Sequence, residues 1–379
     1  MTEIRYGIIG SGMMGHEHIR NIGLIEGARV TAVSDPDEGM RSSAAALAGN
    51  GCAAFTDHAA LLHSGLCDAL VIAAPNHVHH AILKDVLPAD LPVLVEKPLC
   101  TTLADCEEVL ALADGRSSQV WVAMEYRFMP PVERLLGTVR SGDAGQVRMI
   151  SIREHRFPFL KKVGDWNRFE ANTGGTLVEK CCHFFDLMRL IAKAEPVRVY
   201  ASGGMDVNFR DEDYAGRKPD ILDNAYVVID FANGVRGMLD LCMFAEGSTW
   251  QEAIAVTGDL AKVEALVPGP SRFSHDGKER HSEFVFSPRA SKQERREIVD
   301  VDAAFLAAGD HHGSTYFQHL KFFAMIRDGG VAEVSLEDGL QSVRIGLAAE
   351  QSVKTGQAIS LSQSAHELSI RLDQTISAD

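Results

Sequence analysis

The chain has 379 residues, of which 46% are hydrophobic and 23% are charged, and its formal net charge is −15. Because one compact core rarely serves a chain of this length, two domains are expected. The acidic balance, with no local basic cluster, argues against nucleic acid or an anionic membrane as a partner, and no stretch approaches the ~20 apolar residues of a membrane span.

The first third of the chain alternates apolar strands with helices. Strands are expected at residues 4–9, 30–34, 53–55, 69–74, 92–96 and 119–124. Helices are expected at residues 12–26, 40–49, 58–64, 79–87 and 103–113. Continuous apolar strands separated by helices predict a doubly wound parallel sheet that is covered on both faces, with right-handed crossovers.

The first strand leads into Gly-x-Gly-x-x-Gly at residues 10–15, and Asp35 ends the second strand. Gly10 permits the tight turn, Gly12 lets a pyrophosphate approach the backbone, and Gly15 lets the helix pack close to the strand. The helix N-terminus offers free N–H groups to phosphates, and Asp35 would accept hydrogen bonds from ribose hydroxyls. The combination predicts a dinucleotide site; the alternative is a glycine-rich surface turn.

The acids that follow the second strand indicate which nucleotide binds. Asp35 and Asp37 would repel the 2′-phosphate of NADP, and the first basic residue after them is Arg41. NAD is therefore the expected cofactor and NADP is less favoured, with Arg41 as the residue that leaves NADP open.

The pattern changes near residue 145. Strands are expected at residues 147–153, 197–202, 223–231, 235–244, 254–258 and 261–266, with an Asn233-Gly234 hairpin turn. Helices are expected at residues 176–192, 319–327 and 336–355, and an irregular surface excursion at 268–311. Strands so close in sequence predict a mostly antiparallel second sheet. We expect an NAD-binding domain at residues 1–125 and a second domain at residues 126–379.

Seven cysteines are scattered along the chain without framework spacing. They favour a reduced cytoplasm with buried free thiols, and the early first strand, with no apolar signal segment before it, makes export unexpected. Cys181 and Cys182 are interpreted as core thiols rather than as a redox pair, because adjacent cysteines rarely form a disulfide.

Two further motifs stand where neighbouring strands end, the place where open α/β sheets bind ligands. They are Pro75-Asn76-His77-Val78-His79 and Glu96-Lys97-Pro98. With the glycine loop they resemble the glucose–fructose oxidoreductase / inositol dehydrogenase (Gfo/Idh/MocA) family. The resemblance extends through residues 125–130, Trp166, residues 174–176, Glu179, His183 and residues 334–339. It implies an N-terminal Rossmann domain and a C-terminal α+β domain with a large, open, mostly antiparallel sheet. The C-terminal domain, residues 126–379, would bind the substrate and carry the oligomerisation, with homodimers or homotetramers that pack through that sheet.

Three residues are the catalytic candidates. Lys97, partly desolvated and near other positive groups, is expected to have a lowered pKa and to stabilise a developing alkoxide. Glu179 and His183 stand four apart on an expected helix and would project from one face. The resemblance implies that His183 is a general base or proton relay held by Glu179. The structural alternatives are an exposed lysine and a buried histidine beside a helix-stabilising acid.

The sequence departs from the family at this helix. The family usually has Asp where Glu179 stands, and Gly two positions later, where this chain has Cys181. The longer Glu179 must retreat or rotate, and Lys180 adds a charge. We interpret Lys180 as pairing with surface acids, with an acidic substrate group as the alternative.

The remaining candidates surround this centre. Asn76 offers its amide to the ribose or the nicotinamide, and the resemblance implies that Glu96 contacts the nicotinamide ribose. Aromatic rings stack on sugar C–H faces, while Arg and Asn hydrogen-bond hydroxyls. The cofactor candidates are Gly10, Ser11, Gly12, Met13, Met14, Gly15, Asp35, Ala74, Pro75, Asn76, His79, Glu96, Lys97 and Arg127. The substrate candidates are Lys97, Arg156, Trp166, Asn167, His183 and Tyr316.

Two groups of histidines could in principle bind a ligand. His77, His79 and His80 are not expected to bind metal, because their directions diverge and no Cys or carboxylate set completes a site. Residues 311–313, His-His-Gly, either line the pocket or cap the following helix.

The sequence as a whole predicts an NAD-dependent dehydrogenase that oxidises a secondary hydroxyl of a sugar, cyclitol or related polyol. One alternative keeps the cofactor bound through a redox-neutral glycoside cleavage, elimination or epimerisation. Another is a non-catalytic nucleotide-gated regulator, against which the intact Lys97, Glu179 and His183 argue.

Overall fold

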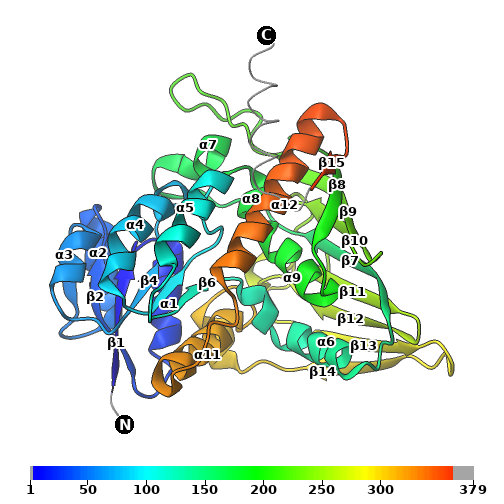
Figure 1. Ribbon diagram of the computed structural model, residues 1–379, viewed down its shortest axis with the longest axis horizontal. Coiled ribbons are helices and arrows are strands. Elements are labelled where there is room, and N and C mark those ends of the chain that lie inside the picture. Colours follow the sequence, from blue (N-terminus) through cyan, green and yellow to red (C-terminus); the bar gives the residue numbers. More distant parts are fainter. Residues whose placement is uncertain (1–2, 362–379) are drawn as a thin grey trace.

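The computed structural model describes residues 3–361 and consists of two sheets with helices packed around them (Figure 1). The first sheet is parallel, with strand order β3-β2-β1-β4-β5-β6. This order reverses direction between β1 and β4, the switch point at which dinucleotides bind in such sheets. The strands are β1 (Ile4–Ile9), β2 (Ala28–Ser34), β3 (Ala53–Phe55), β4 (Ala69–Ile72), β5 (Val93–Val95) and β6 (Val120–Val122). The connecting helices are α1 (Met13–Ile22), α2 (Glu38–Ala48), α3 (His58–His63), α4 (His79–Val86) and α5 (Leu103–Ala113). The predicted doubly wound sheet is confirmed.

The second sheet has the order β14-β13-β12-β11-β7-β10-β9-β8-β15. Within the described part of this second sheet, β7 and β10 are the one parallel pair, so the prediction of a mostly antiparallel sheet is also confirmed. The strands are β7 (Val147–His155), β8 (Pro196–Gly204), β9 (Asn224–Phe231), β10 (Arg236–Cys242), β11 (Glu252–Gly258), β12 (Ala261–Val267), β13 (Ser282–Pro288), β14 (Arg295–Val299) and β15 (Ile359–Ser360). The helices of this half are α6 (Pro130–Ser141), α7 (Glu170–Thr173), α8 (Thr176–Glu179), α9 (Cys182–Ala192), α10 (Ala303–Ala308), α11 (Ser314–Asp328) and α12 (Leu336–Thr355).

The expected surface excursion at residues 268–311 is wrong. This segment contains β13, β14 and α10, and β13 extends the sheet by pairing with β12. Strand β14 lies at the sheet edge and most of its residues are exposed, so charged side chains hide the apolar alternation that identifies a strand. The Asn233-Gly234 hairpin turn is confirmed, with Gly234 at φ +84°.

The single helix expected at residues 176–192 is also wrong, because it is broken into α8 and α9. Cys181 has ψ −6°, far from the helical value, and interrupts the ladder of hydrogen bonds. Residues 180 and 181 therefore belong to a tight link between two helices. Glu179 and His183 consequently do not share the face of one continuous helix.

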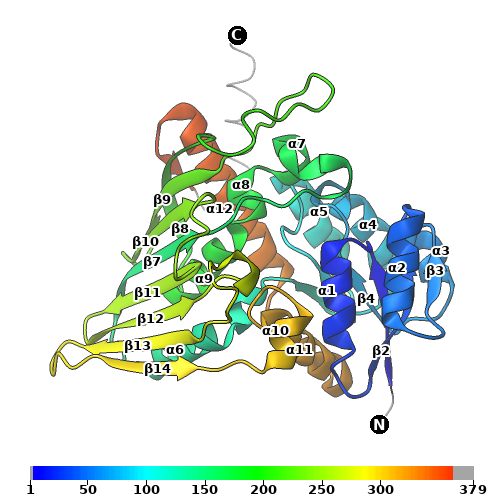
Figure 2. The same cartoon turned by 180° about the vertical axis from the view of Figure 1, so that it is seen from behind.

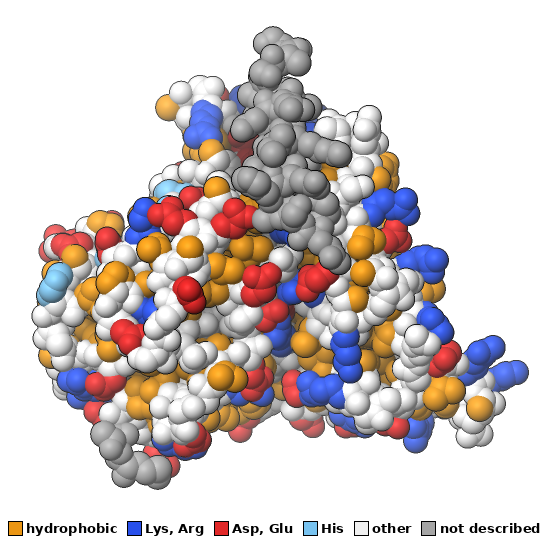
Figure 3. Space-filling model, in the orientation of Figure 1, with side chains coloured by type: hydrophobic (Ala, Val, Ile, Leu, Met, Phe, Trp, Pro, Cys, Tyr) orange, Lys and Arg blue, Asp and Glu red, His pale blue; other side chains and the backbone are white. Residues whose placement is uncertain are grey.

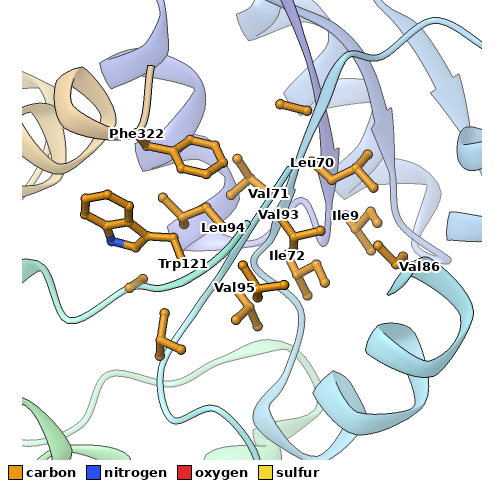
Figure 4. Packing of buried hydrophobic residues seen from close by; sticks show 14 of the residues in the cluster. Ile9, Leu70, Val71, Ile72, Val86, Val93, Leu94, Val95, Trp121 and Phe322 are labelled. Atoms are coloured by element: carbon orange, nitrogen blue, oxygen red, sulfur yellow. The ribbon is translucent and has the colours of Figure 1, made fainter. Parts of the chain in front are cut away.

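The hydrophobic core of the first sheet is completed by the end of the chain. Figure 4 shows Trp121 and Phe322 beside the strand residues of β4 and β5, and the rings of these two residues meet edge to face at 6.2 Å. Residues from α11 and α12 also enter this core. They are Phe322, Phe323, Met325, Leu340 and Val343. The two views of the ribbon agree that α11 lies against α1 (Figure 2).

Helix α12 lies between the two sheets. It packs on β8 and α9 on one side, and on α5 and β6 on the other. It begins with a capping box, in which Ser335 and Asp338 bond each other's backbone N–H groups, and ends at Gly356 with φ +67°. Helix α12 therefore packs the nucleotide half of the molecule against the second half.

Charges of both signs are mixed on the surface. On the face drawn in Figure 3, Asp and Glu side chains alternate with Lys and Arg side chains over both halves of the molecule. In the part of the chain that the structure describes, no helix combines the length and apolar character needed to cross a bilayer.

Candidate active site

The glycine loop joins β1 to α1, and each of its glycines has a distinct environment. Gly10 has φ +93°, and a Cβ there would lie 2.5 Å from the Ala74 nitrogen. A Cβ on Gly15 would collide with the carbonyl oxygen of Gly10. By contrast, a Cβ on Gly12 would meet no protein atom within 4 Å. Gly12 is the N-cap of α1, so this free space faces the unbonded N–H groups of Met13, Met14 and the rest of the first turn. The loop fits a pyrophosphate.

Asp35 ties this loop to the end of β2. One carboxylate oxygen accepts the N–H of Ser11 at 2.8 Å, and the other accepts the N–H of Asp37 at 2.9 Å. Arg41 donates to the Pro36 carbonyl at 3.0 Å, so its guanidinium is turned to the backbone of this turn. The Asp35 carboxylate therefore stays beside the loop, and Arg41 does not neutralise its charge. A negative charge at this place fits a nucleotide whose ribose carries free hydroxyls.

The ends of β4 and β5 carry the next group. Asn76 is buried and its amide nitrogen has no partner among the described residues, so a donor is left for a ligand. Both ring nitrogens of His79 lie close to backbone carbonyls, at 2.9 Å from that of Pro98 and 3.0 Å from that of Ala74, and the neutral imidazole donates to one of them. His79 therefore holds the two strand ends together, with Pro75 in the same turn.

Glu96 belongs to a buried chain of polar groups. Its Oε1 lies 3.0 Å from His18 Nε2, and His18 Nδ1 lies 2.8 Å from His319 Nε2. Its other oxygen accepts the backbone N–H of Lys97 at 3.1 Å. Helices α1 and α11 thus fix the carboxylate of Glu96.

Lys97 points from the end of β5 to the link between α8 and α9. Its Nζ donates to the carbonyl oxygen of Glu179 at 3.1 Å. The expected lowering of its pKa is wrong. Burial alone would lower it, but Cys182 and the neighbouring carboxylates, Glu96 first among them, raise the pKa of Lys97 above its ordinary value. Lys97 therefore stays cationic, which suits it to stabilise negative charge.

His183 lies in a fully buried position with its ring plane fixed. It stacks on Tyr126 with ring centroids 4.2 Å apart and an interplanar angle of 7°. Its Nε2 lies 3.6 Å from Glu125 Oε1, and its Nδ1 has no partner among the described residues. Burial, followed by the charge of Lys97, holds the pKa of His183 well below its usual range. A neutral imidazole with a free nitrogen can accept a proton.

Glu179 turns away from His183 toward the rim of the site. Its Oε1 pairs with Lys162 Nζ at 3.2 Å, and that amine lies 4.4 Å from the Trp166 ring centroid. Trp166 in turn lies 6.0 Å from the ring of His77, which follows Asn76 on the nucleotide side. These contacts bring the two halves of the molecule together over Lys97.

Lys180 is buried, so the interpretation that it pairs with surface acids is wrong. Its Nζ lies 2.8 Å from Glu154 Oε1 and 2.6 Å from the hydroxyl of Tyr126. Tyr126 also donates to Glu252 Oε1 at 3.2 Å. Because the link after α8 turns the side chain inward, Lys180 meets acids that stand on β7 and β11. Its charge is already balanced, which argues against its binding an acidic substrate group.

The remaining substrate candidates, Arg156, Asn167 and Tyr316, have separate sets of neighbours. Arg156 Nη1 lies 3.4 Å from Glu154, beside the Lys180 network. Asn167 is buried and donates to the Leu160 carbonyl at 2.9 Å. Tyr316 stacks on Phe305 at 3.8 Å in an aromatic group between α10 and α11.

Arg127 does not face the glycine loop. It forms ion pairs with Asp186 and Asp338 and donates to the Glu333 carbonyl at 2.7 Å. Its guanidinium thus ties α9 to the start of α12. We therefore leave Arg127 out of the cofactor site proposed below.

His311 lies beside the site as well as before a helix. Its Nδ1 lies 2.8 Å from Glu17 Oε1, which also accepts from Thr315. Its ring lies 6.2 Å from that of Tyr126. Burial would lower its pKa, but Glu17 raises the pKa of His311 to about 9.

Several residues of this site were not among the sequence candidates, although some carried a signal. Glu154 and Glu252 occupy the inward rows of β7 and β11, in register with each other and in line with Ile152 and Ile254. An acid in the buried row of a strand needs a buried partner. Tyr126 stood within the family motif without a role, and Glu125 beside it carried no signal of its own.

The chain matches two family models. Residues 4–124 match "Oxidoreductase family, NAD-binding Rossmann fold", and residues 137–361 match "Oxidoreductase family, C-terminal alpha/beta domain", both of the Gfo/Idh/MocA family. Together these matches span most of the chain, and they confirm the resemblance found in the sequence.

Individual relatives agree with this assignment. The rhizopine catabolism protein MocA of Rhizobium meliloti is 25% identical over 311 residues, covering 81% of this chain and 94% of that protein. Inositol 2-dehydrogenase 1 of Saccharopolyspora erythraea is 28% identical over 345 residues, covering 88% and 97%. Levoglucosan dehydrogenase, solved with NADH and levoglucosan, has the same fold, with a TM-score of 0.80 at 18% identity, covering 96% of this chain and 100% of that one. The chain belongs to the Gfo/Idh/MocA oxidoreductase family, with an NAD-binding Rossmann fold in its first third.

Proposed function

We propose that the protein is an NAD-dependent dehydrogenase that oxidises a secondary hydroxyl of a sugar, cyclitol or related polyol. The observation that carries this proposal is the pairing of a cationic Lys97, beyond the end of β5, with a neutral, buried His183 whose Nδ1 has no partner among the described residues. Relatives named for inositol oxidation support the substrate class. Residues 1–125 would bind the cofactor and residues 126–379 the substrate; residues 362–379 lie outside the described residues.

In this proposal the bound nicotinamide would accept the hydrogen of the carbinol carbon as hydride. His183 Nδ1 takes the hydroxyl proton, and the ammonium of Lys97 stabilises the developing alkoxide. The glycine loop and the first turn of α1 hold the pyrophosphate, and Asn76 and Glu96 orient the nicotinamide end. Trp166 and Arg156 flank the sugar. Asp35 favours NAD over NADP, because its carboxylate would repel a 2′-phosphate.

The test is a panel of sugars, sugar acids and cyclitols with NAD and with NADP, read at the absorbance of the reduced nicotinamide. Net NADH formation with a polyol supports the proposal. Product without net NADH would indicate a redox-neutral cycle instead. On the substrate found, Lys97→Ala should lower kcat by about 10²–10⁴-fold; near-wild-type turnover would remove Lys97 from the mechanism.

We also propose that two copies associate through the outer face of the second sheet. Buried and exposed residues alternate along β8, β9 and β10, so one apolar set faces the core and another faces outward. The outward set is Met149, Tyr200, Tyr226, Val228 and Met238. Such an apolar face is typical of an interface. Sedimentation of the wild type and of Tyr226→Lys tests it, and a wild-type monomer at micromolar concentration would refute it.

The cysteines bear on where the protein works. The seven thiols are free, and free thiols persist in reducing compartments such as the cytoplasm. We propose a cytoplasmic location on this ground.

A further inference from the structure

Glu125 is a carboxyl group in the site to which the reaction above assigns no role. It begins the short helix η3 (Glu125–Phe128) after β6 and is 1% exposed. Neither of its oxygens has a hydrogen-bond partner among the described residues. A carboxyl buried without a partner is costly, and such a group in a site is more often retained for chemistry than for stability.

The neighbour of this carboxyl is His183 Nε2, at 3.6 Å from Glu125 Oε1. Catalytic hydrogen bonds are often this long before the ligands bind. The ring cannot easily turn away, because it stacks on Tyr126, and Tyr126 is anchored by Lys180 at 2.6 Å and by Glu252 at 3.2 Å. The buried network around Lys180 therefore fixes the plane of the His183 ring, and in that plane Nε2 is the nitrogen near Glu125.

The carboxylate of Glu179 is engaged elsewhere. Its Oε1 pairs with Lys162, and its backbone carbonyl accepts from Lys97. Among the described residues, Glu125 is the one whose carboxylate lies within 4 Å of a His183 nitrogen. Glu125, rather than the expected Glu179, is thus the carboxylate next to His183. The break between α8 and α9 accounts for this difference, because it rotates Glu179 off the face that carries His183.

We propose that Glu125 is the positioning residue for His183, holding the imidazole with its proton on Nε2 and leaving Nδ1 free for the substrate. The inference rests on the proposed function. When Nδ1 takes the proton of the hydroxyl, the imidazolium that forms lies beside the Glu125 carboxylate, which stabilises its charge. Oxidised nicotinamide, when bound, would take the carbinol hydrogen as hydride, so the alcohol would lose one proton to His183 and one hydride to the cofactor and become a carbonyl. The arrangement follows the logic by which an acid orients the histidine of a hydrolase triad.

The groups that face Glu125 set the pH at which this arrangement works. They are Glu96 and Lys97 after β5, His183 and Cys182 on α9, and His311 before α11. Burial, followed by the charge of Glu96, raises the pKa of Glu125 to about 7. Below pH 7 the carboxylate is therefore lost, and with it the stabilisation of the imidazolium.

Glu125→Gln tests the proposal, since the amide keeps the volume and removes the charge. It should lower kcat by about 10²–10⁴-fold with little change in KM, and the acidic limb of kcat near pH 7 should disappear. Glu125→Asp should recover part of the rate. Glu350→Gln is the matched control: Glu350 is also buried with a pKa raised to about 7, and its Oε1 accepts the Leu177 N–H, which an amide oxygen can replace. This control should keep the limb.

A second readout needs no activity. In histidine ¹⁵N spectra of the cofactor-free protein above pH 7, the His183 signal, assigned with His183→Asn, should show the proton on Nε2. A proton on Nδ1, or a Glu125→Gln variant with wild-type kcat and pH profile, overturns the proposal. If the wild type reduces no NAD with any alcohol, the proposed function fails, whereas the tautomer still tests the contact with Glu125.

Discussion

The three glycines of the loop after β1 should fail in different ways when each is changed to Ala. A Cβ on Gly12 meets open space, and its φ of −75° suits any residue. Gly12→Ala should therefore change the free energy of unfolding by less than about 1 kcal/mol. The same methyl occupies the space that we assign to the pyrophosphate. If it displaces one or two charge-assisted hydrogen bonds of about 1.5–3 kcal/mol each, NAD should bind roughly 10- to 100-fold more weakly or worse.

Gly15→Ala and Gly10→Ala should act on folding instead. The added Cβ at Gly15 collides with the Gly10 carbonyl, which should cost about 1–3 kcal/mol of stability. Gly10→Ala adds the strain of φ +93° to a collision with Ala74 and should cost more. Gly137→Ala in α6, where a Cβ also meets nothing within 4 Å, is the control and should alter neither property adversely.

The assays are urea unfolding of the cofactor-free variants and calorimetric titration with NAD. The reasoning is refuted if Gly12→Ala binds NAD like the wild type, because the open space would then not be the pyrophosphate site. It is equally refuted if Gly12→Ala loses as much stability as Gly15→Ala.

Three further predictions concern charged groups. Lys180→Met should lower the free energy of unfolding by up to about 3–5 kcal/mol, because the buried Glu154 loses its partner at 2.8 Å and is left with Arg156 at 3.4 Å. Adding Glu154→Gln should restore most of this loss, and a loss below about 1 kcal/mol in urea unfolding contradicts the reasoning. The pKa of His311 is raised to about 9, so the stabilisation that protonated His311 provides is complete below pH 6.5 and is lost as the pH rises to 9, by roughly 3 kcal/mol at most. Glu17→Gln should flatten this dependence of the free energy of unfolding on pH. An unchanged dependence would exclude the His311–Glu17 pair as its source. Asp35→Asn should shift the ratio of kcat/KM for NADP over NAD upward by at least roughly tenfold, and an unchanged ratio would mean that the charge of Asp35 does not select the nucleotide.

Much of the fold follows from local patterns. The helices over Leu103–Ala113 and Leu336–Thr355 and the strand Ala53–Phe55 agree with their predicted ranges, because apolar spacing and capping residues such as Ser335 define them without tertiary help. The edge strand Arg295–Val299 has no such pattern, since most of its side chains face water. Its strand character comes from pairing with β13, which local sequence does not display.

The site was predictable to a lesser degree. The glycine loop and Lys97 stand out because motifs at strand ends imply ligands. The pKa of Lys97, however, depends on Cys182, Glu96 and other carboxylates that reach it from separate segments. The burial of Lys180 depends on the two-residue link, residues 180 and 181, between α8 and α9. A small change in the backbone angles of this link turns the side chain from solvent into the core.

The packing of α11 and α12 into the first sheet has a practical consequence for dissecting the protein. The Rossmann half is not an autonomous unit, because Phe322 covers Trp121 and the backbone of Val334 bonds to that of Val122. A recombinant fragment that stops near residue 125 would expose to water the apolar surface that Phe322 and Val334 cover, and it should aggregate. Chimeras that exchange the nucleotide half between relatives need to carry residues 314–343 with it.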